Sequence, residues 1–120
     1  MARRDITGAV NFEVLEGFTA GDQAVIDEVL DLFRQQVELW TPLLDAKSDG
    51  WRDAAHTVKG AAAGIGADAL ARVCGEAEVT PDNLAGPVLD RVRTALDAAV
   101  GDVAAYQHEQ MLRSLRSPRP

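Results

Sequence analysis

The chain has 120 residues and a mass of 12.8 kDa, which is the size of one domain with its own core. Its formal net charge of −7 excludes a general nucleic-acid binder, which needs a basic face. Only 5% of the residues are aromatic, which favours close-packed helices over a β-sandwich. No apolar run approaches the roughly 20 residues that span a bilayer. Because Cys74 is the only cysteine and the N-terminus has no secretory apolar segment, we expect a cytoplasmic protein with no membrane contact.

A short helix and then a long one are the first predicted elements. The short helix lies near residues 11–16 and ends around Gly17. Asp22 is the predicted N-cap of the long helix, and Pro42 either kinks that helix or begins its last turn. Residues at three- and four-residue steps predict its inward face, namely Val25, Val29, Leu32, Phe33, Gln36, Leu39, Trp40 and Leu43.

The next helix follows a turn at residues 47–50, and Ser48 or Asp49 is expected to cap it. Its core-facing side is predicted to hold Trp51, Ala55, Val58, Ala62 and Ile65. The opposite side carries Arg52, His56, Lys59, Gly60 and Ala63. This helix therefore has one apolar side and one side rich in reactive and charged groups.

Two further helices complete the predicted fold. Gly64–Gly66 ends the helix of His56, and residues 67–78 form another helix, with Leu70, Val73, Cys74 and Ala77 inward. Gly86-Pro87 begins the last helix, which ends near Leu112 and has an apolar stripe of Leu89, Val92, Leu96, Ala99, Val103 and Tyr106. We expect a single domain over residues 1–120, with an ordered core of about 8–113 and a flexible tail at 114–120. The fold class is all-α, an antiparallel up-down four-helix bundle with a short extra N-terminal helix.

The polar side of the helix at 51–65 predicts a site for an anion. Neutral imidazole is a nucleophile, and Lys59 places an ammonium one turn from His56, where it suits phosphoryl oxygens. Gly60 leaves room for the backbone of another protein to approach the ring. The chain has no Walker-type glycine loop and no kinase signature, so we expect neither ATP binding nor autokinase activity.

One known family has this pattern. The segment 55–60 reads Ala-His-Thr-Val-Lys-Gly and is followed at matching spacing by Ile65-Gly66-Ala67, Leu70, Cys74 and Glu78. Over most of residues 10–110 the chain resembles the histidine-containing phosphotransfer (HPt) domain of two-component phosphorelays. The resemblance implies a phosphoryl carrier rather than an enzyme, in which His56 accepts a phosphoryl group from a receiver-domain aspartyl phosphate and passes it to another receiver. It also implies that Lys59 steadies the phosphoryl oxygens, Gly60 admits the receiver's loop, and Glu78 accepts the inner N–H of the ring.

The resemblance also indicates partners and cofactors. The expected partners are response-regulator receiver domains, with a hybrid histidine kinase as a further candidate, and the chain is expected to be a monomer. It would hold no metal or cofactor of its own, because the receiver supplies Mg²⁺. Arg52, Ala63 and Gly64 are the expected partner-binding residues, since Arg52 adds to a positive rim that suits an acidic receiver pocket.

Three other interpretations stay open. The same bundle could be an adaptor that binds receiver or kinase domains without being phosphorylated. A metal-dependent enzyme would use His56 and Glu78 with Cys74 or His108, although the chain has no two-histidine helical motif. A histidine-kinase dimerisation domain would carry an acidic residue and a proline after the histidine, and this sequence lacks them there.

Overall fold

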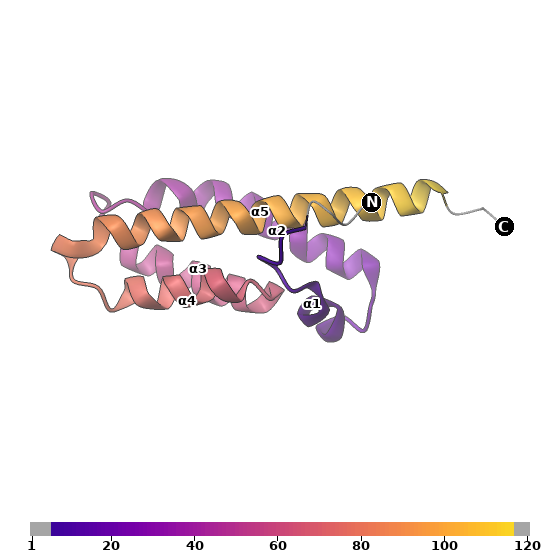
Figure 1. The fold of residues 1–120 in the computed structure, drawn as a ribbon, viewed down its shortest axis with the longest axis horizontal. Helices are drawn as coiled ribbons and strands as arrows, with labels where there is room; N and C mark the ends of the chain where they lie inside the picture. Colours follow the sequence, from indigo (N-terminus) through magenta and orange to yellow (C-terminus); the bar gives the residue numbers. More distant parts are fainter. Residues whose placement is uncertain (1–5, 117–120) are drawn as a thin grey trace.

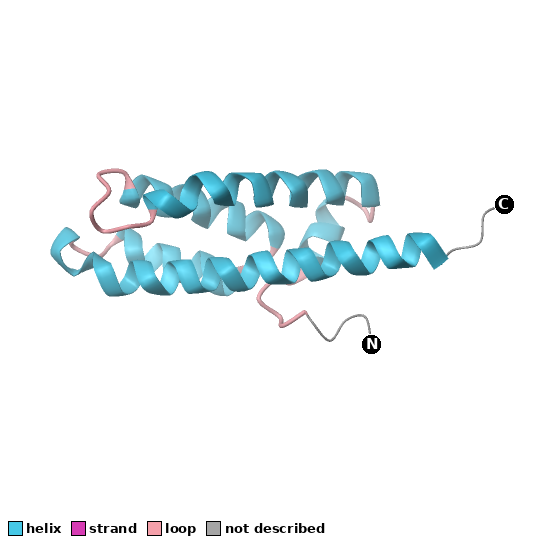
Figure 2. Cartoon of the chain, turned by 90° about the horizontal axis from the view of Figure 1, so that it is seen from above, coloured by secondary structure: helices cyan, strands magenta, loops and turns pink. Residues whose placement is uncertain are grey.

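The computed structural model describes residues 6–116, in which all regular structure is helical (Figure 2). The elements in chain order are α1 (Phe12–Phe18), α2 (Gln23–Trp40), the 3-10 turn η2 (Thr41–Leu43), α3 (Trp51–Ile65), α4 (Asp68–Glu78), the 3-10 turn η3 (Asp82–Leu84) and α5 (Ala85–Arg116). The four longer helices alternate in direction along an elongated bundle, and α1 lies across one end (Figure 1). This arrangement confirms the predicted all-α up-down bundle with its short N-terminal helix. Within the described residues, no helix has the length and apolar character that crossing a membrane would require.

The buried face of α2 differs from the predicted one. Its core residues are Ile26, Leu30, Phe33 and Trp40. Of the residues predicted to face inward, several are instead exposed, namely Val25, Leu32, Leu39 and Leu43. The prediction is confirmed for Phe33 and Trp40 and wrong for the four exposed residues. The reason is that α2 carries two apolar stripes one position apart, both with helical spacing, and spacing alone does not say which stripe meets the core. One of these stripes therefore remains on the surface.

The helix caps follow the sequence in part. The side chain of Asp22 accepts hydrogen bonds from the backbone N–H groups of residues 24 and 25, as predicted for an N-cap. Neither Ser48 nor Asp49 caps α3, so that prediction was wrong. The turn places Gly50 at the cap position, and the Ser48 hydroxyl accepts a hydrogen bond from the Gly50 N–H instead.

Gly66 joins the end of α3 to the N-terminal segment. Its φ of 83° lies in the left-handed region, which favours glycine. The backbone N–H of Asn11 donates to the Gly66 carbonyl at 2.9 Å. A Cβ on Gly66 would lie 2.3 Å from the Asn11 carbonyl oxygen, so only glycine allows this approach.

A buried carboxylate ties the N-terminal segment to α5. Asp102 is 1% exposed, and its side chain accepts hydrogen bonds from the backbone and hydroxyl of Thr7 and from the backbone N–H groups of Gly8 and Val10. The predicted apolar stripe of α5 is buried along its whole length. The helix continues to Arg116, so residues 114–116 of the predicted flexible tail are helical, and 117–120 lie outside the described residues. Pro118 is the first residue after Leu112 that is incompatible with a helix interior.

Candidate functional site

His56 lies on the exposed side of α3. The five residues predicted to face the core from this helix are all buried, and they anchor it along its other side. The side chain of His56 is 70% exposed. A rigid, packed helix thus holds an accessible imidazole, which a reacting partner can approach from solvent.

A single carboxylate contacts both His56 and Lys59. Glu78 is the last residue of α4, the helix that packs beside α3. Its Oε2 lies 2.8 Å from Nδ1 of His56, and its Oε1 lies 2.6 Å from Nζ of Lys59. The structure therefore brings together the three residues that the sequence pattern places in two different helices, and it supplies the contact with the inner ring nitrogen that the resemblance implies.

The electrostatics of Glu78 fix the hydrogen positions on the ring. The hydrogen bond from Lys59 and then that from His56 hold the pKa of the Glu78 carboxyl below its usual range, although partial burial opposes them. Glu78 is therefore an anion at neutral pH and can only accept hydrogen bonds. In the neutral ring, the hydrogen is accordingly on Nδ1 of His56 and the lone pair is on Nε2. This is the tautomer in which the outer nitrogen is a nucleophile.

The approach to the ring is open. A Cβ added to Gly60 or Gly64 would meet nothing within 4 Å. On α4, a Cβ on Gly75 would lie 3.8 Å from Cδ of Lys59, so the lysine stem passes over that glycine toward Glu78. Gly60 thus has the free space that the sequence pattern predicts, and Gly75 is a further small residue at the site.

An apolar groove runs between α2 and α3 beyond the histidine. Its lining comes from both helices and consists of Val29, Leu32, Phe33, Gln36, Trp40, Ala61, Gly64 and Ile65. Gly64 lies in the groove, and the other apolar candidate for partner contact, Ala63, is exposed beside it on α3. The sequence prediction missed Leu32 as a surface residue because it assigned Leu32 to the core. The surface stripe of α2 therefore forms one wall of a groove on the same side of the molecule as the predicted contact residues of α3.

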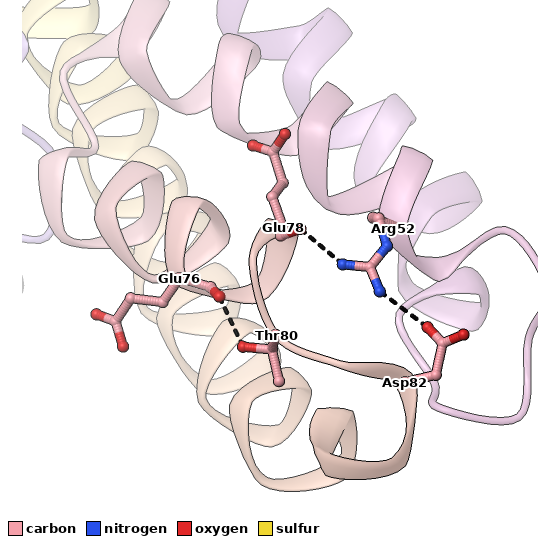
Figure 3. Close-up of polar contacts among 5 residues, drawn as sticks. All are labelled: Arg52, Glu76, Glu78, Thr80 and Asp82. Carbon is pink, nitrogen blue, oxygen red and sulfur yellow. Dashed lines mark hydrogen bonds and ion pairs between the residues drawn. The ribbon is translucent and has the colours of Figure 1, made fainter.

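Arg52 is engaged within the chain rather than standing as a free cation at the rim. Its Nη1 donates to the backbone carbonyl of Glu78 at 2.6 Å, and its Nη2 donates to Oδ1 of Asp82 at 2.9 Å (Figure 3). The guanidinium also lies 4.3 Å from the ring centroid of Trp51. No sequence pattern signals the bond to a backbone carbonyl, and the sequence prediction did not include Asp82.

The other reactive side chains lie apart from this arrangement or are inaccessible. Cys74 is fully buried, and burial, followed by the nearby Glu78 charge, raises the pKa of its thiol to about 11. His108 is exposed on α5. Among residues 6–116, the His, Cys, Asp and Glu side chains form no group of three or more that is placed to hold a metal ion.

Comparison with known proteins gives two findings. The model of the Hpt domain family matches residues 23–105, a span that begins with α2 and includes most of α5. The crystal structure of the histidine phosphotransferase ShpA from Caulobacter crescentus is similar to this chain, with 59% sequence identity and a TM-score of 0.82. The similarity covers 91% of this chain and 100% of that one. A comparison with functionally curated proteins gave no match.

Proposed function

This chain belongs to the Hpt domain family, and from that premise we propose that it is a phosphorelay carrier. In this proposal His56 takes a phosphoryl group from the aspartyl phosphate of one receiver domain and delivers it to another. The observation that carries the proposal is the contact between Nδ1 of His56 and the ionised Glu78, which leaves Nε2 as the nucleophile on an exposed helix face. In this proposal the chain carries the phosphoryl group on its own side chain and neither binds ATP nor acts as a kinase.

The two ring nitrogens of His56 have different parts in the transfer. The Nε2 lone pair attacks phosphorus, a P–N bond forms, and the P–O bond to the receiver's aspartate breaks, so that the aspartate leaves as a carboxylate. The hydrogen on Nδ1 stays in place, and the positive charge that develops on the ring is offset by Glu78, 2.8 Å away. Delivery to the second receiver reverses these bonds. The work of the protein is to hold the nucleophile in line, as phosphoryl transfer requires.

Lys59 and Gly60 serve the incoming group. Lys59 binds Glu78 in the unphosphorylated protein, and its side chain is 40% exposed. Because a lysine ammonium sits on a flexible stem, it can turn from Glu78 to the phosphoryl oxygens as their charge arrives. Gly60 leaves the space into which the receiver's active-site loop fits. The Mg²⁺ that offsets charge on the transferred group comes from the acidic pocket of the receiver, and this chain supplies no cofactor of its own.

The receiver docks on the groove between α2 and α3. Leu32 and Gly64 present small and apolar surface there, and Ala63 is exposed beside them on the helix that carries His56. Apolar contacts at the centre of an interface supply most of the binding energy, and charged groups at the rim steer the encounter. A hybrid histidine kinase can present the donor receiver, and the carrier meets each receiver as a monomer.

The test is phosphotransfer from a phosphorylated receiver in the absence of ATP. The expected result is an acid-labile label on the carrier that is absent from His56→Gln, followed by loss of the label when a second receiver is added. ATP alone should leave the protein unlabelled. A receiver that binds but never transfers its label, across several candidate receivers, would overturn the carrier function in favour of the unphosphorylated adaptor.

A further inference from the structure

The C-terminal end of α4 is held by side chains from outside the helix. The last carbonyls of an α-helix have no partner within the helix, and together they form the negative end of its dipole. In α4, the hydroxyl of Thr80 donates to the Glu76 carbonyl at 2.7 Å, and Arg52 donates to the Glu78 carbonyl at 2.6 Å (Figure 3). The last turn of α4 contains no basic residue. Arg52, which belongs to α3, supplies the missing cation.

Arg52 is itself held in place. Its guanidinium lies against the ring of Trp51, which is buried at the start of α3, and its second amino group contacts Asp82. The Asp82 side chain is 84% exposed, so this ion pair is weak and screened by salt. The contact with the Glu78 carbonyl is partly buried, and we assign it the larger role.

Glu78 is contacted by three side chains of α3, those of Arg52, His56 and Lys59. His56 follows Arg52 by four residues on α3, so the two side chains are neighbours on one face. The imidazole of His56 meets the carboxylate of Glu78, and the guanidinium of Arg52 meets its backbone carbonyl. The helix that carries the histidine therefore also fixes the backbone of the residue that orients the histidine.

We propose that Arg52 is a positioning residue for His56. It fixes the main chain of Glu78, so that the carboxylate meets Nδ1 and the ring keeps its lone pair on Nε2. The effect on phosphoryl transfer rests on the proposed carrier function, whereas the effect on the ring does not. Arg52 thus acts through Glu78 and needs no contact with the phosphoryl group or the receiver.

A substitution that keeps the charge separates this role from a purely electrostatic one. Lysine at position 52 retains the positive charge but lacks the planar fork that reaches the Glu78 carbonyl and Asp82 together. If Arg52 only supplied charge to the partner, Arg52→Lys would behave like the natural protein. If it positions Glu78, Arg52→Lys should resemble Arg52→Ala.

The experiment reads the ring directly. In protein with ¹⁵N-labelled histidine, nitrogen chemical shifts report which ring nitrogen of neutral His56 carries the hydrogen. We expect the hydrogen on Nδ1 in the natural protein, and a shift toward the Glu78→Ala pattern in both Arg52→Ala and Arg52→Lys. Arg72→Ala is the matched control, since it removes one positive charge from α4 on its side toward α5. Natural nitrogen shifts in the Arg52 variants would overturn the proposal.

Transfer kinetics give a second and independent measurement. With a phosphorylated receiver at saturation, the rate of transfer should fall roughly tenfold in Arg52→Ala, because a misplaced nucleophile loses in-line geometry. The receiver concentration for half-maximal rate should stay unchanged. A raised half-maximal concentration with an unchanged maximal rate would make Arg52 a docking residue and overturn the proposal. If Arg52→Ala fails to fold, Arg52→Lys carries both measurements. If no receiver phosphorylates the natural protein, the carrier function fails while the nitrogen shifts still test Arg52.

Discussion

Replacing Leu32 by alanine should weaken receiver binding without impairing the chemistry at His56. Leu32 lines the groove between α2 and α3 and is 55% exposed. Burying a whole leucine side chain is worth about 1.5–3 kcal/mol, so covering the exposed half contributes about 0.8–1.6 kcal/mol. At about 1.4 kcal/mol per factor of ten, and with one methyl group retained in alanine, the dissociation constant of the receiver complex should rise roughly 3- to 10-fold. Stability should change little, because the side chain is largely in water already.

The assay is a binding titration with an unphosphorylated receiver, together with transfer rates at saturating phosphorylated receiver. The maximal rate should match that of the natural protein, since Leu32 lies in the groove and the contacts that join His56, Lys59 and Glu78 do not include it. Met111→Ala is the control, because Met111 is 50% exposed and lies near the far end of α5. An unchanged dissociation constant for Leu32→Ala, or an equal rise for Met111→Ala, would refute docking on this groove.

Three further predictions concern stability and reactivity. The lowered pKa of Glu78 makes its charge stabilising above the ordinary glutamate range, and this contribution is lost as pH falls through the folded-state pKa. Urea titrations should therefore show the natural protein more stable than Glu78→Gln at neutral pH, with the difference shrinking as the pH falls below the ordinary glutamate pKa of 4.5. A difference that grows on acidification would contradict the ion pairs. Gly66→Ala should lower the free energy of unfolding by about 2 kcal/mol or more, because alanine is strained at this positive φ and its Cβ would meet the Asn11 carbonyl. Gly64→Ala is the control, because Gly64 lies within a helix with free space around it, and the change should be neutral or stabilising by up to about 1 kcal/mol. Equal effects of the two substitutions in the same denaturation assay would argue against the close approach of Gly66 to Asn11. Cys74 should resist a thiol reagent in the folded protein and react on unfolding, because burial raises its pKa to about 11; rapid labelling of the native state would show that the thiol is accessible.

The parts of the fold that the sequence predicts well are those with one apolar stripe. In α3 and α5 the apolar residues recur on a single face, and every residue of the predicted stripes is buried. In α2 the stripes that contain Leu32 and Phe33 are adjacent, and only packing against the other helices selects the second as core. The choice depends on tertiary contacts, which periodicity does not encode.

The sequence predicted the part of the candidate site that consists of reactive and charged side chains. His56, Lys59 and Glu78 are reactive or charged groups at a recognisable spacing, and the structure brings them together. The contact of Arg52 was not predictable, because it ends on a backbone carbonyl that any residue at position 78 would provide. The predicted cap of α3 was wrong for a related reason. The geometry of the turn places Gly50, and not a residue with a hydroxyl or carboxyl side chain, at the cap position.

The bond between Asp102 and the N-terminal segment has a consequence for the order of folding during synthesis. Thr7 leaves the ribosome 95 residues before Asp102, so the segment around Thr7 lacks this partner until α5 has emerged. Pairing at such sequence separation is slow compared with the packing of α3 on α4, which are joined by a short turn. Burying the Asp102 carboxylate without its hydrogen-bond donors would cost free energy. We therefore expect α5 and the N-terminal segment to pack together in one late step. The N-terminal segment therefore packs onto the bundle only after α5 has been made.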